Sequence, residues 1–277
     1  MILEAPAKIN LALDVLCRRP DNYHEVDMIM QSISLADEIR LSPQAELEIV
    51  CSHPLVPADQ RNLAWRAAEA LRDHAAISSG ARIEIKKRIP IAAGLAGGSS
   101  DAAAVLKGLN RLWNLNLSND ELLTIGARLG ADVPFCVQGG TMRAQGIGEK
   151  LTPVATGLKG EVLLITPDFP VPTAQIYRRL QVDEIRRHPP VSQVAERLRS
   201  GALESIPEIW GNVLQEVAFR EFPELNRVKQ FFDKYRLECL MSGSGPTLFT
   251  LNPPPETAVK LLAEVPAGWF GCLTPIR

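Results

Sequence analysis

A glycine-rich segment, Pro90 to Asp101, constrains the fold of this chain more than any other stretch. The alternation of Ile83 and Ile85 before it predicts a short strand over residues 81–89, and apolar residues at helical spacing after it predict a helix over 100–113. A strand, a glycine-rich loop and a helix start in this order make an anion site. The reason is that the first turn of a helix presents unpaired N–H groups and a partial positive charge.

The glycines and serines of this segment fit two interpretations. Gly94, Gly97 and Gly98 have no Cβ, so the backbone can come close to a phosphate. Ser99 and Ser100 add hydroxyl donors or a Mg²⁺ contact. The same composition is typical of a flexible loop before a helix N-cap, but we favour phosphate binding. The chain has neither a P-loop motif nor a Rossmann glycine fingerprint, so a nucleotide would bind at a less common type of site.

Composition narrows the class of protein. A chain of 277 residues, 46% hydrophobic and 22% charged, can form one large or two moderate soluble domains. The net charge of −2 and the aromatic content of 5% favour neither a nucleic acid nor an anionic membrane as partner. The five scattered cysteines lack zinc-site spacings and are expected to be reduced. With no apolar run of membrane-spanning length and no room for a signal peptide before the first strand, we expect a cytoplasmic protein.

Residues 8–15 alternate strictly between apolar and other side chains, as in a strand. Lys8, Asn10 and Asp14 therefore share one face, opposite the apolar one. The pattern alone fits a solvated surface as well as a functional face. Pro6, just before this strand, restricts the backbone where the strand begins, and this slightly favours a functional face.

Aromatic side chains follow in a turn-rich loop over 18–25. Asn22 is suited to the left-handed backbone conformation of a turn. Tyr23 and His24 offer an aromatic face and a hydrogen-bonding ring, which together could hold a flat heterocycle. An exposed Tyr–His pair more often has no ligand, so this motif needs support from elsewhere.

Two polar residues lie next to helix ends. Asn62 begins a predicted helix and is either its cap or a contact for adenine. Asp132 follows Gly130, which we expect to end a helix opened by a capping box of Ser118 and Glu121. A half-buried Asp132 near a phosphate site would serve in acid–base chemistry or charge positioning. A structural aspartate that bonds its own turn is the alternative.

We place a domain boundary near residues 153–159, where the side chains become mostly polar and small. A helix from Thr173 carries Tyr177, and residues 183–190 predict a surface loop. Ser242 to Thr247 form a second glycine–serine turn between two short strands. Taken alone, that turn predicts a tight hairpin.

Three of these segments, in this order, resemble the sequence motifs of the GHMP kinases: Pro6-Ala7-Lys8-Ile9-Asn10, Pro90 through Ser100, and Ser242-Gly243-Ser244-Gly245-Pro246. Two more segments resemble the members of that superfamily that act on a cytidine-diphosphate-linked sugar alcohol: Arg19 through His24, and Leu129 through Pro134. The resemblance runs nearly the full length of the chain. Each motif is weak alone, and their order together is specific.

The resemblance implies an α+β fold of two lobes with the active site in the cleft between them. A lobe of the ribosomal-S5-domain-2 type would cover residues 1–155, and an α+β lobe would cover 156–277. It also implies ATP-dependent phosphorylation of the 2-hydroxyl of a CDP-linked methylerythritol, in the non-mevalonate route to isoprenoid precursors. The partners would be these small molecules and Mg²⁺ held mainly through phosphates, with no nucleic acid and no membrane, and the protein would be a monomer or homodimer.

The resemblance also assigns roles to residues by position. Lys8 and Asp132 become the catalytic pair: the aspartate would accept or orient the hydroxyl proton, and the lysine would keep it ionised and offset charge on the phosphoryl group. The residues that would contact the substrate are Asn10, Tyr23, His24, Thr173 and Tyr177. The residues that would contact ATP are Asn62, Leu63, Lys87, Pro90, Gly94, Leu95, Ala96, Gly97, Gly98, Ser99, Ser100, Gly243 and Ser244.

The chain departs from the family pattern at four positions where glycine is usual: Asn22, Ala92, Ala93 and Ala96. Ala96 matters most, because its methyl group would crowd the phosphates if the backbone there has a positive φ. No carboxylate stands out as a Mg²⁺ ligand.

Two other functions remain to be weighed. A different GHMP kinase, such as a homoserine kinase, would act on a small amino acid that needs no aromatic grip like Tyr23-His24. A non-catalytic binding module could share the fold, since fold alone proves no activity. The presence of both Lys8 and Asp132 weighs against the module.

Overall fold

The computed structural model describes residues 1–155 and 158–277 and divides into two compact units. The first unit contains Met1–Ala7, Leu35–Ile89 and Ala96–Gly139, and the second contains Lys8–Ser34, Pro90–Leu95 and Gly140–Arg277. The domain boundary predicted between residues 155 and 156 falls at the two residues outside this description.

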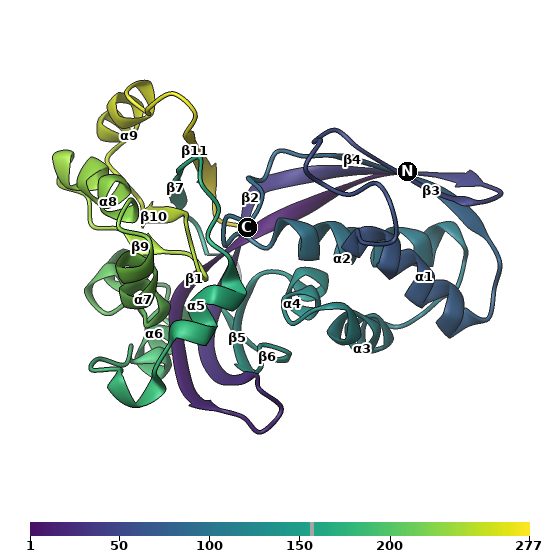
Figure 1. Cartoon of the computed structure of the whole chain (residues 1–277), viewed down its shortest axis with the longest axis horizontal. Helices are drawn as coiled ribbons and strands as arrows, with labels where there is room; N and C mark the ends of the chain where they lie inside the picture. The colour runs from purple at the N-terminus through teal and green to yellow at the C-terminus, as the bar shows by residue number, and fades with distance from the viewer. Residues whose placement is uncertain (156–157) are drawn as a thin grey trace. The chain divides into compact units, whose positions relative to one another are not determined.

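The first unit combines a sheet with four helices. Its strand order is β3-β4-β2-β1, with β3 parallel and β2 antiparallel to β4. The strands are β1 (Ile2–Arg18), β2 (His24–Gln44), β3 (Leu47–Cys51) and β4 (Gly80–Lys86), of which β1 and β2 each contribute one part to this unit. The helices are α1 (Leu63–Ala75), α2 (Gly97–Leu112), α3 (Asn119–Leu129) and α4 (Val133–Gln138). Figure 1 shows α1 and α2 side by side along one face of these strands.

Small residues let the helices of this unit pack closely. Ala64, Ala67 and Ala68 are buried on α1, which packs against the alanine-rich buried face of α2. The predicted capping box of Ser118 and Glu121 is confirmed at the start of α3. Gly130 ends α3 as predicted, but with an extended backbone (φ 177°) in place of the left-handed conformation.

The predicted strand over 81–89 ends at Lys86, because the next backbone N–H groups bind a side chain. Asp37 Oδ1 accepts hydrogen bonds from Arg88 N at 2.5 Å and from Ile89 N at 2.9 Å. A carboxylate therefore takes the place of a strand partner where the chain leaves the sheet for the glycine-rich segment.

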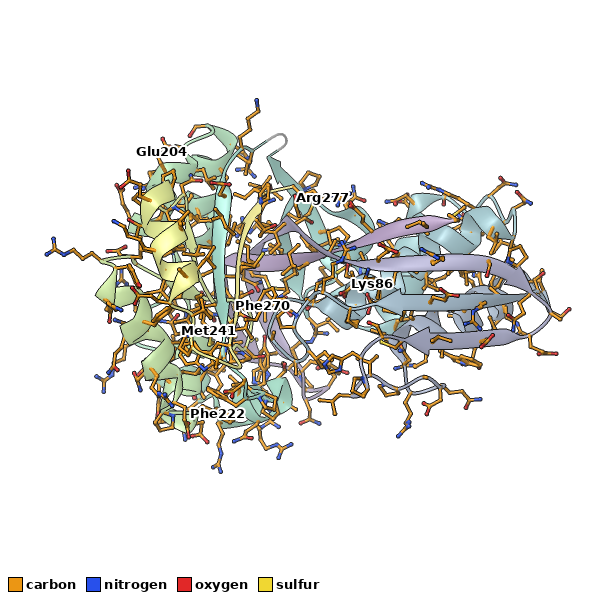
Figure 2. All side chains as sticks on the ribbon, turned by 90° about the horizontal axis from the view of Figure 1, so that it is seen from above. Lys86, Glu204, Phe222, Met241, Phe270 and Arg277 are labelled. Atoms are coloured by element: carbon orange, nitrogen blue, oxygen red, sulfur yellow. The ribbon has the colours of Figure 1, made fainter. Side chains whose placement is uncertain are left out.

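The second unit contains a four-stranded antiparallel sheet of order β11-β7-β10-β9. Its strands are β7 (Glu161–Thr166), β9 (Leu240–Met241), β10 (Leu248–Leu251) and β11 (Phe270–Pro275). Three of the helices follow one another as α7 (Leu214–Glu221), α8 (Leu225–Lys234) and α9 (Pro255–Ala263). In Figure 2, α9 (yellow) lies along one side of this sheet, and the labels Met241 and Phe270 mark two of its strands.

The rest of the second unit surrounds the remaining parts of β1 and β2. β1 pairs in parallel with β8 (Gly211–Asn212), and β2 pairs antiparallel with β5 (Thr141–Gly146), which also pairs with β6 (Lys150–Ala155). Two helices complete it, α5 (Thr173–Arg179) and α6 (Val191–Arg199), with 3₁₀ turns at Val182–Glu184 and Leu203–Glu208. Among the residues described, no helix is long and apolar enough to cross a membrane.

Candidate active site

Lys8 lies almost completely buried on β1, with 4% of the residue exposed. Its ammonium group donates hydrogen bonds to Asn10 Oδ1 at 2.8 Å and to the carbonyl oxygen of Gly94 at 3.0 Å. The strand alternation predicted from the sequence is thus realised: Lys8 and Asn10 point to the same side and bind each other. The lysine is held in place by its neighbour and by the glycine-rich segment.

The second glycine–serine turn packs directly against Gly94. Ser242 Oγ donates to the Gly94 carbonyl oxygen at 3.0 Å. Gly94 has φ +74°, and a Cβ there would stand 2.2 Å from the Ser242 carbonyl oxygen, so only glycine fits. A Cβ on Gly243 would lie 3.2 Å from Lys8 Nζ. The three motif segments, far apart in sequence, therefore meet at one place in the second unit.

Asn212 holds this turn, a role that the sequence did not reveal. Its Nδ2 group donates to the carbonyl oxygens of Met241 and Gly243, both at 2.7 Å, and its Oδ1 accepts from Leu214 N at 3.0 Å. The residue is 8% exposed. The sequence around Asn212 gives no sign of this role, because two of its three partners, Met241 and Gly243, lie about 30 residues further along the chain.

Aromatic and hydroxyl groups predicted for substrate contact also come together in this unit. The rings of His24 and Tyr177 lie 5.1 Å apart, and Tyr23 is 59% exposed. Thr173 Oγ1 and Ser244 Oγ share a hydrogen bond of 2.7 Å. Burial, together with the positive charge of Arg18, lowers the pKa of His24, so its ring is neutral at pH 7. A neutral imidazole carries one donor and one acceptor.

In the first unit, α2 begins on a strained residue. Ala96 is the N-cap of α2 and has a left-handed backbone with φ 57°, and Ala92 likewise has φ 53°. Ser100, in the first turn of α2, is buried, and its hydroxyl donates to the Pro6 carbonyl oxygen at 2.7 Å. Asn22 adopts the left-handed conformation predicted for it, with φ 68°. The positive φ on which the predicted crowding of phosphates by the Ala96 methyl group depends is therefore present, and the crowding itself stays a prediction.

We expect Ala96→Gly to raise the free energy of unfolding by about 0.5–1 kcal/mol. A left-handed backbone costs an L-residue ~1–2 kcal/mol, and the extra flexibility of glycine in the unfolded chain offsets part of the gain. Ala93→Gly is the matched control, because Ala93 is buried and lies outside the left-handed region. That control should lower stability. Denaturant unfolding of both variants measures the effect, and a loss of stability in Ala96→Gly would contradict it.

Lys87, predicted to contact adenosine, lies between two buried carboxylates. Its ammonium group donates to Asp101 Oδ2 at 2.7 Å and to Asp37 Oδ2, and its side chain is 6% exposed. Burial would lower the pKa of Lys87, but the charges of Asp101 and Asp37 outweigh it and raise the pKa above its usual value. The Asp37–Lys87–Asp101 cluster joins the residues before the glycine-rich segment to the first turns of α2.

Asp101 is the member of this cluster whose hydrogen bonding is incomplete. Its Oδ1 atom is buried without a hydrogen-bond partner. Burial, opposed by Lys87, raises the pKa of Asp101 from 3.8 to about 7. The cluster therefore carries a carboxyl group that takes up a proton in the folded protein well above the pH at which it would do so when unfolded.

This difference predicts a pH dependence of stability. Between about pH 4 and about pH 7 the folded state binds the Asp101 proton and the unfolded state does not, so the free energy of unfolding falls as pH rises, by at most ~1.4 kcal/mol per unit. Asp101→Asn should remove this part of the profile. The exposed Asp73→Asn on α1 is the control and should keep it. Identical profiles for wild type and Asp101→Asn would disprove the prediction.

The other predicted residues of the first unit lie at helix starts. Asn62 caps α1, accepting from Ala64 N at 2.9 Å and donating to the Pro57 carbonyl oxygen at 2.7 Å, with half-buried Leu63 next to it. Asp132 is half-buried at the N-cap position of α4 and makes no capping hydrogen bond through its side chain. Asp132 belongs to the first unit and Lys8 to the second.

Nothing in the described part of the chain forms a ready metal centre. No group of three or more histidine, cysteine, aspartate or glutamate side chains there is placed to hold a metal ion. Ser99 is half-buried and lies in the first turn of α2, the turn in which a helix presents its unpaired N–H groups. This arrangement suits an anion, or a cation that arrives bound to one.

Comparison with known proteins agrees with these motifs. The family models described as GHMP kinases N terminal domain and GHMP kinases C terminal match residues 62–140 and 192–270. A 4-diphosphocytidyl-2-C-methyl-D-erythritol kinase of Geobacillus sp. (strain WCH70) is 50% identical over 254 residues, which is 91% of this chain and 88% of that protein. The Bacillus subtilis (strain 168) protein of the same name is also 50% identical, over 90% of this chain and 88% of its own.

Solved structures give the same result. A crystal structure of 4-(cytidine 5'-diphospho)-2C-methyl-D-erythritol kinase matches with a TM-score of 0.83 and 34% identity, over 100% of this chain and 99% of that one. A homoserine kinase from Cytophaga hutchinsonii matches with a TM-score of 0.72 and 16% identity, over 100% and 93%, which shows the fold alone. The chain therefore belongs to the GHMP kinases and, within them, to the family of the 4-diphosphocytidyl-2-C-methyl-D-erythritol kinases.

Proposed function

We propose that this protein transfers the γ-phosphoryl group of ATP to the 2-hydroxyl of 4-(cytidine 5'-diphospho)-2-C-methyl-D-erythritol, giving the 2-phosphate and ADP. This step belongs to the non-mevalonate route to isoprenoid precursors. The observation that carries the proposal is the meeting of Lys8, Gly94 and the Ser242–Gly245 turn, in a chain 50% identical to kinases of that name. A homoserine kinase has no use for the His24–Tyr177 ring pair, and homoserine kinases resemble this chain at the level of fold alone.

For the chemical step we propose Lys8 and Asp132 as the catalytic pair. Phosphoryl transfer depends mainly on positioning and on stabilising the charge that develops on the transferred group. Asp132 would accept or orient the proton of the attacking hydroxyl, and Lys8 would offset charge on the phosphoryl oxygens. The hydrogen bonds from Lys8 to Asn10 and Gly94 support this role, because they fix the ammonium group before the substrate arrives.

We propose that ATP binds along the glycine-rich segment. Gly94 through Ser100 would enclose the phosphates with backbone N–H groups, aided by the start of α2 and by Gly243 and Ser244. Asn62, Leu63, Lys87 and Pro90 would lie on the adenosine side. Asn62 and Lys87 already use their side chains within the protein, which favours contact through backbone or apolar atoms.

Magnesium would enter with the nucleotide. When bound, Mg²⁺ bridges phosphate oxygens and neutralises part of their charge. Because the described residues hold no group of three or more histidine, cysteine, aspartate or glutamate side chains placed for a metal, the phosphates and water would supply most ligands, with the Ser99 hydroxyl as a candidate from the protein.

We propose that the cytidine end of the substrate binds at Tyr23, His24 and Tyr177. The exposed ring of Tyr23 offers a stacking face, and the neutral ring of His24 offers one donor and one acceptor to the edge of a cytosine. Asn10 and Thr173 would face the sugar-alcohol end. The family matches at residues 62–140 and 192–270 fall on either side of residue 155, which supports the proposed domains 1–155 and 156–277.

The decisive experiment measures ADP release with Mg-ATP and three acceptors in parallel: the CDP-linked methylerythritol, homoserine and mevalonate. Turnover with the cytidine compound alone is the expected result. Turnover with homoserine or mevalonate would move the function elsewhere in the superfamily. Absence of turnover with all three, in a protein that binds ATP, would refute the proposal.

A further inference from the structure

A buried aspartate and a half-exposed histidine form a pair that none of the roles above uses. Asp14 is 5% exposed, and its Oδ1 accepts hydrogen bonds from His188 Nδ1 at 2.7 Å and from Val15 N at 2.8 Å. A carboxylate has no proton to donate, so Nδ1 of His188 carries the hydrogen of this bond. Nε2 is the ring nitrogen that this bond leaves for a ligand, and 49% of the side chain is exposed.

The pair lies on the strand face that carries the proposed sugar-alcohol contacts. Lys8, Asn10 and Asp14 are separated by even numbers of residues on β1, so their side chains project to one side of the strand. The neighbouring residue Pro189 packs against Gly211, whose partner on β1 is Ala12. The loop that carries His188 is thus seated on β1 directly beside this face.

The segment that supplies His188 also supplies the proposed cytidine contacts. Thr173 binds Ser244, and the ring of Tyr177 lies 5.1 Å from that of His24, tilted by 39°, before the chain reaches His188. Residues 173–190 therefore make three contacts near the proposed substrate site. They contact the glycine–serine turn at Ser244, the ring of His24, and the carboxylate of Asp14. A ligand that extends from His24 to Asn10 would run beside it.

The proposed substrate has a diphosphate between its cytidine end and its sugar-alcohol end. A CDP-linked sugar alcohol carries its diphosphate between the cytidine and the acceptor hydroxyl, and a diphosphate requires charged or N–H donors. An imidazole whose Nδ1 is fixed by a buried carboxylate presents its second nitrogen in a set direction, as in other carboxylate–histidine pairs. The same loop carries the exposed Arg186 and Arg187 directly before His188, and the acidic Asp183 and Glu184 lie further from it in the sequence.

We propose that His188, as the doubly protonated imidazolium ion, binds the diphosphate of the substrate by donating a hydrogen bond from Nε2–H, and that Asp14 positions the ring by accepting the Nδ1–H bond. The two anionic partners, Asp14 and the diphosphate, both favour this cationic form of the ring. This inference rests on the proposed function. His188 would serve only the cytidine diphosphate and not ATP, so it is a specificity residue for the acceptor substrate. The alternative role, anchorage of the loop on β1, requires the Nδ1 bond alone.

Two variants separate these roles. His188→Asn keeps a donor near the Nδ1 position and so preserves the bond to Asp14, but it loses the group at Nε2. His188→Gln places its amide near the Nε2 position and loses the Nδ1 bond. Calorimetric titration of wild type and both variants with cytidine and with CDP, without ATP, gives the contribution of the diphosphate as the ratio of the two affinities. Thermal unfolding of each variant reports anchorage.

We expect wild type to bind CDP more tightly than cytidine and His188→Asn to lose about tenfold to hundredfold in CDP affinity, as for one charge-assisted hydrogen bond. Its cytidine affinity, its KM for ATP and its unfolding temperature should be unchanged, and His188→Gln should retain part of the CDP preference. An unchanged CDP preference in His188→Asn would overturn the inference and leave the cytidine site intact. Equal binding of cytidine and CDP by wild type would do the same. Binding of neither by wild type would overturn the proposed function as well.

Discussion

Replacement of Asp132 by asparagine is expected to lower kcat by ~10²–10⁴-fold, the usual contribution of a positioned acid–base group. The amide keeps the size of the side chain and the N-cap position on α4, but it cannot accept the hydroxyl proton as a carboxylate does. ATP affinity should stay close to that of wild type, because the proposed phosphate contacts lie in the glycine-rich segment. ADP release at saturating substrates gives kcat, and calorimetric titration gives the ATP affinity.

A matched control distinguishes chemistry from a general effect of lost charge. Asp120→Asn removes an exposed carboxylate from the first turn of α3, in the same unit, and should leave kcat nearly unchanged. Near-full activity of Asp132→Asn would remove Asp132 from the catalytic pair. Loss of ATP binding in step with kcat would instead place the aspartate at the nucleotide.

Features encoded over a few neighbouring residues could be predicted from the sequence. The strand of residues 8–15, the helix after the glycine-rich segment and the capping box at Ser118 are all present, because alternation, helical spacing and cap chemistry act locally. The left-handed backbone of Asn22 is another such case. The shared face of Lys8 and Asn10 followed from the two-residue period of a strand, and the structure adds the hydrogen bond between them.

Pairings between distant segments could not be predicted in the same way. The family resemblance assigned Lys87 to the adenosine site, and nothing in the sequence indicated that its side chain joins Asp37 and Asp101, which lie 50 and 14 residues away. The hydrogen bonds of Asn212 and the Asp14–His188 pair could not be predicted for the same reason, since their partners are also distant in the sequence. A buried polar group is recognisable only when its surroundings are known, since the same residue types are ordinary on a surface.

The buried cluster also carries the largest expected effect on stability. Lys87→Met should lower the free energy of unfolding by about 3–5 kcal/mol at pH 8, because it leaves the carboxylates of Asp37 and Asp101 buried without their cation. Below pH 7 the loss should shrink, since Asp101, whose pKa is already raised to about 7, can then take up a proton. Urea unfolding at pH 6 and pH 8 measures both values.

The next residue along the chain supplies the control for this prediction. Arg88 pairs with Glu38 at 3.1 Å on the surface, with 52% and 27% of the two side chains exposed, so Arg88→Met should cost no more than ~1 kcal/mol. Adding Asp101→Asn to Lys87→Met should recover part of the stability, because one of the two buried charges is then gone. If Lys87→Met and Arg88→Met lost equal, small amounts, the cluster would contribute no more than a surface ion pair. If the double variant recovered nothing, the loss in Lys87→Met would have to come from the packing of the buried lysine stem and not from the unpaired carboxylates.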